Sequence, residues 1–134
     1  MCIRDSIKMN SMTKKDFRDL KFVVSENIEW IAMSFVRKKE DVISLQRRIK
    51  KSASTARVIA KIEKPEAVKN IDEIIDCADG IMIARGDLGV EIPAHKVPVL
   101  QKKIVNKCRF ASKPCIIATQ MLESMTNNLS LIHI

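Results

Sequence analysis

Glycine, proline and aromatic residues are all scarce in this sequence. It has three glycines and four prolines, and aromatic residues make up 4% of its 134 positions. Because 46% of the residues are hydrophobic, the composition excludes a disordered chain and indicates a globular domain. No apolar run approaches the roughly 18 residues that a membrane-spanning helix requires, so we expect no membrane association. Residues 1–6 lack the apolar core of a secretory signal.

A cysteine framework is also lacking. The four cysteines, Cys2, Cys77, Cys108 and Cys115, do not show the CxxC spacing of a metal or redox motif. Neither a zinc site nor a set of structural disulfides is therefore indicated. We expect reduced thiols in a cytoplasmic protein.

Acidic residues are in the minority, with 16 Asp and Glu against 24 Lys and Arg, which gives a formal net charge of +8. Most of the basic residues alternate with apolar residues at helical spacing, as on solvated helix faces. A nucleic-acid-binding protein would more often place aromatic residues among the basic ones, so we expect no nucleic-acid partner. An anionic small substrate is compatible with the charge, although the charge does not show one.

Hydrophobic periodicity along the chain alternates between helix and strand. Short apolar runs predict buried strands over residues 31–36, 57–62, 80–84 and 115–118. Amphipathic spacing predicts helices over residues 13–27, 40–50 and 94–108, and a further helix that begins at Pro65. Thr13 and Asp16 have the spacing of a capping box at the start of the first helix. This alternation predicts an α/β fold in which crossover helices join the strands of a parallel sheet.

Residues 79–92, DGIMIARGDLGVEI, combine a buried strand with an abruptly polar, glycine-rich continuation. Two glycines around Asp87 predict a tight turn whose backbone N–H groups can approach a ligand closely. Pro93 is suited to the first turn of the helix that follows. The alternative is an ordinary glycine turn that carries a solvated aspartate.

Four polar residues fall at the carboxyl ends of the predicted strands. Lys61 and Glu63 are two positions apart and so point to the same side, while Asp87 and Thr119 follow the next two strands. Paired carboxylates suit Mg²⁺ or Mn²⁺, and a nearby lysine can stabilise charge that develops on a phosphoryl group or an enolate. The alternatives are a structural ion pair between Lys61 and Glu63, and a Thr119 hydroxyl that bonds its own backbone.

Three long motifs in this order closely resemble pyruvate kinase. They are AKIEKPEAVKNIDEII at residues 60–75, DGIMIARGDLGVEIP at 79–93 and KPCIIATQMLESM at 113–125. The similarity extends over about residues 6–125. It implies a partial (β/α)₈ TIM barrel that contains about the fourth to seventh strands with their helices. We therefore expect one partial catalytic barrel domain over residues 7–128, with residues 1–6 and 129–134 as non-native ends.

The resemblance also implies a reaction, in which the phosphoryl group of phosphoenolpyruvate passes to ADP and gives pyruvate and ATP, the last step of glycolysis. In that family Lys61 would stabilise the transition state of phosphoryl transfer. Glu63 and Asp87 would be the protein ligands of the catalytic Mg²⁺ or Mn²⁺.

Other positions receive roles from the same resemblance. The backbone N–H groups of Gly86 and Asp87 would bind the substrate carboxylate. Thr119 would lie near the substrate methylene and act in the proton transfer that forms pyruvate. Ser34 and Phe35 match a pair that lines the floor of the pocket, with a weaker claim to function.

Parts of the family pattern have no match in this chain. These are the K⁺ ligands, the phosphate-binding arginine, the inserted lid domain and the eighth strand. The full-length family is usually a cytoplasmic homotetramer. Because only part of the site is matched, we expect this chain to be inactive by itself. The alternatives are a Mg²⁺-dependent aldolase or lyase barrel that handles pyruvate or phosphoenolpyruvate, and an inactive half-barrel fragment.

Overall fold

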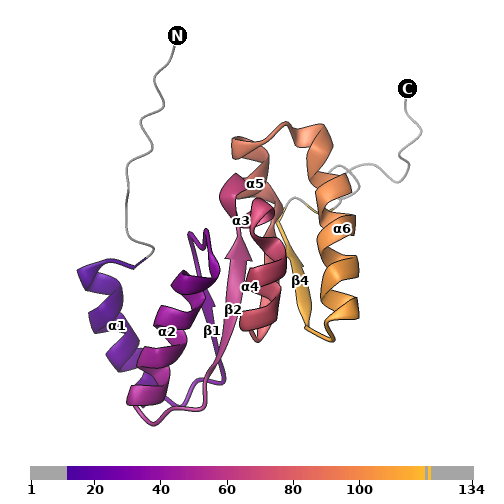
Figure 1. Cartoon of the computed structure of the whole chain (residues 1–134). Helices are drawn as coiled ribbons and strands as arrows, with labels where there is room; N and C mark the ends of the chain where they lie inside the picture. Colours follow the sequence, from indigo (N-terminus) through magenta and orange to yellow (C-terminus); the bar gives the residue numbers. More distant parts are fainter. Residues whose placement is uncertain (1–11, 120, 122–134) are drawn as a thin grey trace.

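Four parallel strands form a single sheet in the computed structural model, which describes residues 12–119 and residue 121 (Figure 1). The strands are β1 (Trp30–Met33), β2 (Arg57–Ile62), β3 (Gly80–Ala84) and β4 (Cys115–Ala118). They lie side by side in the order β1-β2-β3-β4, and each neighbouring pair is parallel. The prediction of an α/β fold with a parallel sheet is confirmed, and the arrangement is consistent with part of a (β/α) barrel.

Helices connect the strands in sequence order. They are α1 (Lys14–Ser25), α2 (Lys39–Lys51), α3 (Pro65–Lys69), α4 (Ile71–Cys77), α5 (Arg85–Glu91) and α6 (Val97–Phe110), with a 3₁₀ turn, η1 (Ala94–Lys96), before α6. The helix predicted to begin at Pro65 is divided at Asn70 into α3 and α4. None of the helices in the described part of the chain is long and apolar enough to cross a membrane.

The start of α1 follows the predicted capping box. The Thr13 hydroxyl accepts a hydrogen bond from the Asp16 N–H at 3.2 Å, and an Asp16 carboxylate oxygen accepts one from the Thr13 N–H at 2.6 Å. The two bonds satisfy donors that would otherwise lack partners at the helix start. The local sequence is therefore sufficient to place this helix boundary.

The main hydrophobic core lies between the sheet and the helices on one of its faces (Figure 1). Alternate residues of β2, namely Val58, Ala60 and Ile62, are fully buried on this face. The same core includes apolar residues of α2, α4 and α6, such as Leu45 and Ile74. Because each crossover helix returns over the same face of the sheet, the buried stripes of the helices converge on one core.

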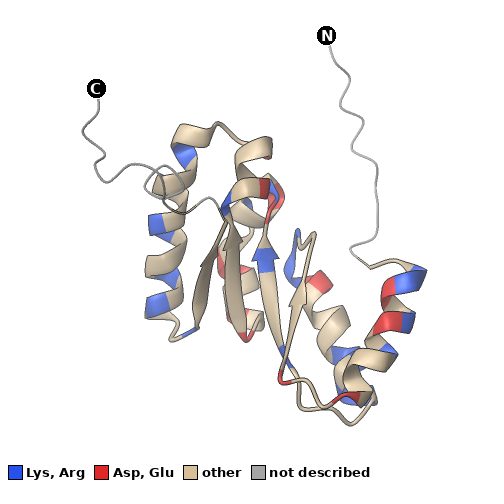
Figure 2. Cartoon of the chain, turned by 180° about the vertical axis from the view of Figure 1, so that it is seen from behind, with Lys and Arg blue, Asp and Glu red and all other residues tan. Residues whose placement is uncertain are grey.

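The opposite face of the sheet is not covered by any helix within residues 12–119 (Figure 2). Ile116 is 43% exposed. A hollow of about 270 Å³ is lined by Trp30, Ile59, Gly80, Ile81, Pro114 and Ile116. Figure 2 also shows that the charged residues lie mainly on the helices and that the strands are almost free of charge. In a closed barrel this face would point inward, where apolar side chains fill the interior.

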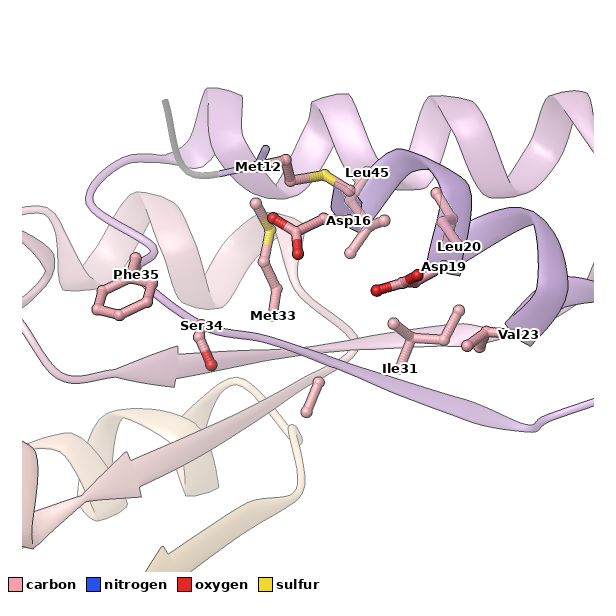
Figure 3. Close-up of a pocket in the computed structure, with 11 residues that line it drawn as sticks. Met12, Asp16, Asp19, Leu20, Val23, Ile31, Met33, Ser34, Phe35 and Leu45 are labelled. Atoms are coloured by element: carbon pink, nitrogen blue, oxygen red, sulfur yellow. The ribbon is translucent and has the colours of Figure 1, made fainter. Parts of the chain in front are cut away.

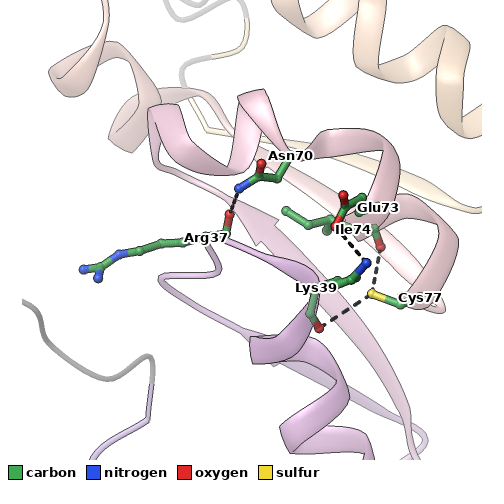
Figure 4. A network of polar contacts seen from close by, with 6 residues as sticks. All are labelled: Arg37, Lys39, Asn70, Glu73, Ile74 and Cys77. Atoms are coloured by element: carbon green, nitrogen blue, oxygen red, sulfur yellow. Dashed lines mark hydrogen bonds and ion pairs between the residues drawn. The ribbon is translucent and has the colours of Figure 1, made fainter.

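Polar contacts join the beginning of α2 to α3 and α4 (Figure 4). The Asn70 side-chain amide donates to the Arg37 carbonyl at 2.9 Å, and Lys39 forms an ion pair with Glu73 at 3.1 Å. The Cys77 thiol of α4 donates to the Lys39 carbonyl at 3.9 Å. The Lys39–Glu73 pair is exposed and contributes little by itself, so the burial of apolar residues carries most of this contact between helices.

Two of the predicted local structures are wrong. The strand predicted over residues 31–36 ends at Met33, and the glycine turn predicted after residue 84 is the helix α5. None of the described glycines has a positive φ angle. Leu88 in α5 is fully buried. The helix places this apolar side chain in the interior, and the burial outweighs the preference of the two glycines for a turn. The predicted non-native ends, residues 1–6 and 129–134, lie outside the described residues.

Substitution of isoleucine by alanine should lower the free energy of unfolding by different amounts on the two faces of the sheet. Ile83 is fully buried, so we expect Ile83→Ala to lower the free energy of unfolding by about 2–5 kcal/mol. Ile116→Ala removes the same atoms from the uncovered face and should cost much less. Urea unfolding of this chain with either change measures the difference. Equal losses would show that Ile116 is as well buried in solution as Ile83, which would contradict an uncovered face.

The thiols of Cys108 and Cys115 should differ in reactivity. A hydrogen bond with Cys115 and burial both raise the pKa of Cys108, whereas the same bond lowers the pKa of Cys115 below the ordinary thiol value. The thiolate is the reactive form, so Cys115 should begin to react with iodoacetamide at lower pH than Cys108. Mass spectrometry of tryptic peptides across a pH series tests this, with half-buried Cys77 as a control. Alkylation of Cys108 before Cys115 would contradict it.

Candidate active site

The residues that follow the four strands lie at one edge of the sheet. Ile62 is in register with Ile83, and Ala84 is in register with Ala118. Glu63 and Thr119, which follow β2 and β4, are therefore placed on either side of the end of β3. The carboxyl ends of parallel strands are where α/β proteins, including barrels, place their sites.

Lys61 and Glu63 form the central ion pair of this edge. The Lys61 Nζ lies 2.5 Å from Glu63 Oε1. The Glu63 side chain is 5% exposed and that of Lys61 is 24% exposed. Burial of a carboxylate is costly unless it is paired and hydrogen-bonded. The structural ion pair considered as an alternative is therefore present. It holds the Lys61 ammonium and the Glu63 carboxylate at the carboxyl edge of the sheet.

The residues after β1 form hydrogen bonds with both members of this pair. The Lys61 ammonium donates to the Ser34 hydroxyl at 3.1 Å, and the Phe35 backbone N–H donates to Glu63 Oε2 at 3.2 Å. Each carboxylate oxygen of Glu63 thus has a partner, a cation on one side and an amide on the other. The sequence motif suggested Ser34 and Phe35 only as pocket lining, and it contained no signal for the bond from the Phe35 backbone.

A second contact joins the ends of β3 and β4. The Gly86 backbone N–H donates to the Thr119 hydroxyl oxygen at 3.1 Å. The Thr119 hydroxyl therefore binds the neighbouring segment, which differs from the alternative in which it bonds its own backbone. Asp87 lies in the first turn of α5 and is exposed.

A further ion pair, which the sequence analysis missed, anchors α5 beside β2. Lys64 directly follows Glu63, and its Nζ lies 2.6 Å from Glu91 Oε1 at the end of α5. Lys64 also lies 5.9 Å from the centre of the Phe35 ring. Lys64 and Glu91 are 27 positions apart, and nothing in their local pattern links them. This pair ties together the segments that carry Glu63, Asp87 and Phe35.

Carboxylate oxygens fit a hard divalent cation such as Mg²⁺ or Mn²⁺ better than a softer metal such as Zn²⁺ or Cu²⁺. Within the described residues, no group of three or more His, Cys, Asp and Glu side chains could hold a metal ion. Mg²⁺, however, is often held by one or two carboxylates together with oxygen atoms of the substrate and water. Glu63 and Asp87 can supply two carboxylates. Their approach to a common ion stays a prediction.

A pocket of about 410 Å³ adjoins this edge of the sheet between α1, β1 and α2 (Figure 3). Its walls are largely apolar, and α1 contributes Asp16 and Asp19 to the lining. Ser34 and Phe35 belong to the lining as well, and Figure 3 shows their side chains on different sides of the chain. The pocket therefore meets the polar cluster at Ser34 and Phe35.

The parallel sheet, its crossover helices and the polar strand ends define a (β/α)-barrel type of enzyme domain. Comparison with known proteins gives the family: a match to "Pyruvate kinase, barrel domain" covers residues 3–131. The chain belongs to the pyruvate kinase family.

Individual relatives agree with this assignment. The chain is 48% identical over 124 residues to pyruvate kinases of Sporosarcina psychrophila and Clostridium acetobutylicum. It is 47% identical over 122 residues to pyruvate kinase of Dictyostelium discoideum. These alignments cover 91–92% of this chain but only 21%, 26% and 24% of the respective relatives. The chain thus spans about a fifth to a quarter of the length of the curated relatives that it matches.

Proposed function

We propose that this chain supplies part of a catalytic site that transfers the phosphoryl group of phosphoenolpyruvate to ADP, with pyruvate and ATP as products. The observation that carries the proposal is the Lys61 ammonium, held at the end of β2 by Glu63 at 2.5 Å and by Ser34 at 3.1 Å. Phosphoryl transfer depends mainly on position and on stabilisation of charge. A partly buried, oriented cation provides both.

Lys61 is proposed to act on the transferred group. Its side chain is 24% exposed, so part of it remains open to a ligand while two contacts fix its direction. A cation oriented before the reaction stabilises developing negative charge without reorganisation, and it does so more strongly where water is partly excluded. In this position Lys61 would stabilise the oxygens of the phosphoryl group during transfer.

Glu63 and Asp87 are proposed to hold Mg²⁺ or Mn²⁺. The ion would neutralise substrate oxygens and orient the phosphoryl group. Backbone N–H groups in the first turn of a helix lack partners within the helix, which supports Asp87 as a donor to the substrate carboxylate. The Gly86 N–H, the second proposed donor, donates to the Thr119 hydroxyl in this structure and would exchange that contact for the substrate. The Thr119 hydroxyl, once released, would serve the proton transfer at the substrate methylene.

The other class considered, a Mg²⁺-dependent aldolase or lyase, would use a similar acidic pair. Formation of ATP from ADP is the reaction that distinguishes the kinase. A requirement for K⁺, a homotetramer and a cytoplasmic location are proposed from the family alone. The assays below therefore use the complete protein that contains this chain, with Mg²⁺ and K⁺ supplied.

Substitution of Lys61 tests the proposed chemistry. Lys61→Met should lower kcat by about 10²-fold or more, as does the loss of one strong electrostatic donor. Because Glu63 is buried, the same change should also destabilise the protein. Lys61→Arg keeps a cation beside Glu63 and serves as the stability control, although its planar guanidinium cannot replace a compact ammonium. A coupled pyruvate assay and thermal unfolding measure both properties. A folded Lys61→Met variant with wild-type kcat would refute the role.

Substitution of Asp87 tests the proposed metal site without disturbing the ion pair. Asp87 is exposed, and the loss of its carboxylate leaves Lys61 and Glu63 in contact. Asp87→Asn should weaken Mn²⁺ binding by about tenfold or more. The matched control is Asp76→Asn, which changes an exposed carboxylate on α4. Titration followed by electron paramagnetic resonance measures both variants. If the two bound Mn²⁺ equally well, Asp87 would not be a ligand.

A further inference from the structure

Five described residues other than glycine have a positive φ angle: Asn27, Phe35, Ala53, Ser112 and Thr119. Asn27, Ala53 and Ser112 lie two positions after the ends of α1, α2 and α6, where a left-handed residue commonly ends a helix. Phe35 and Thr119 have no such explanation. They follow β1 and β4, the two outer strands of the sheet, at the edge that carries the candidate active site.

The side chain of Phe35 does not account for its left-handed backbone. Its φ is 56°, which is unfavourable for a bulky residue with a Cβ atom. The residue is 54% exposed, and its ring lies 5.9 Å from the Lys64 ammonium, at the outer limit of a cation–π contact. Burial of the ring is therefore too small to select this conformation. Residues in such conformations persist where the surrounding structure holds them, most often at functional sites.

One polar contact accompanies the left-handed conformation of Phe35 in the structure. The Phe35 N–H donates to Glu63 Oε2 at 3.2 Å, while Lys61 occupies Oε1 at 2.5 Å. Glu63 is the only charged residue that is buried in the described part of the chain. The preceding residue, Ser34, accepts a hydrogen bond from Lys61. Two consecutive residues after β1 thus hold both members of the ion pair on β2.

We propose that Phe35 is a positioning residue: its left-handed backbone turns the chain away from β1 at the point where its N–H meets Glu63, and this N–H sets the carboxylate for a divalent cation. This inference rests on the proposed metal-binding role of Glu63. Phe35 acts through its backbone and does not itself contact the metal. Its φ angle and its N–H therefore matter, and the aromatic ring does not.

Three variants of the complete protein separate the backbone from the ring. Phe35→Gly keeps the N–H and adopts a positive φ without strain, so Mn²⁺ should bind as tightly as in the wild type. Phe35→Pro removes the N–H and excludes a positive φ, and it should weaken Mn²⁺ binding by about tenfold or more, as the loss of a partner of a metal ligand does. Replacement of Phe35 by phenyllactate turns the peptide bond between Ser34 and Phe35 into an ester and removes the N–H alone. If Phe35→Pro does not fold, this ester variant tests whether the loss of the N–H weakens Mn²⁺ binding.

The readout is Mn²⁺ affinity from paramagnetic resonance, with Glu63→Gln measured in parallel. Weak binding by the ester, with wild-type binding by Phe35→Gly, supports the inference. Wild-type affinity in the ester variant overturns it if Glu63→Gln has lost Mn²⁺, because the metal role of Glu63 then stands without the Phe35 N–H. Wild-type affinity in Glu63→Gln overturns the metal role itself. Weak binding by Phe35→Gly would show that the ring is required, and that also overturns the inference.

Discussion

The parallel pairing of all four strands constrains the remainder of the structure. A parallel neighbour can be reached only after the chain has returned along the sheet, and here helices make each return on the same face. The apolar stripes of α2, α4 and α6 therefore share one core with the sheet. The same geometry brings the carboxyl ends of all four strands to one edge. Core and candidate site are thus consequences of a single topological requirement.

Glu63 links stability to function at that edge. A buried carboxylate would destabilise the fold if it were left alone, and its partners come from two segments, Lys61 on its own strand and Phe35 after the neighbouring strand. Lys64, the next residue, pairs with Glu91 and so adds α5 to the same assembly. The groups that could act on a phosphoryl ligand are therefore also groups that hold three chain segments together.

The two faces of the sheet differ in a way that follows from the barrel architecture. On one face, Val58, Ala60 and Ile62 of β2 are fully buried under the helices. On the other, Ile116 is substantially exposed beside an apolar hollow. A (β/α)₈ barrel fills its interior with side chains from all eight strands, and four strands contribute only part of such a layer. The uncovered face is therefore the face that this family turns toward the barrel interior.

The sequence by itself determined most of the elements and their order. Apolar runs located β2, β3 and β4 with the bounds seen in the structure, and Thr13 with Asp16 marked the start of α1. Local patterns suffice there because burial period and capping involve residues close in the chain. The positions of the polar residues after the apolar runs likewise predicted one common edge for Lys61, Glu63, Asp87 and Thr119.

Only the tertiary structure decided how these groups meet. The burial of Leu88 converted the expected glycine turn into α5, and β1 ended early so that the Phe35 N–H reaches Glu63. The ion pair between Lys64 and Glu91 spans 27 positions. Such contacts depend on packing between segments distant in the chain, and packing overrides local preference wherever burial or charge pairing contributes more than the conformation of a single residue costs.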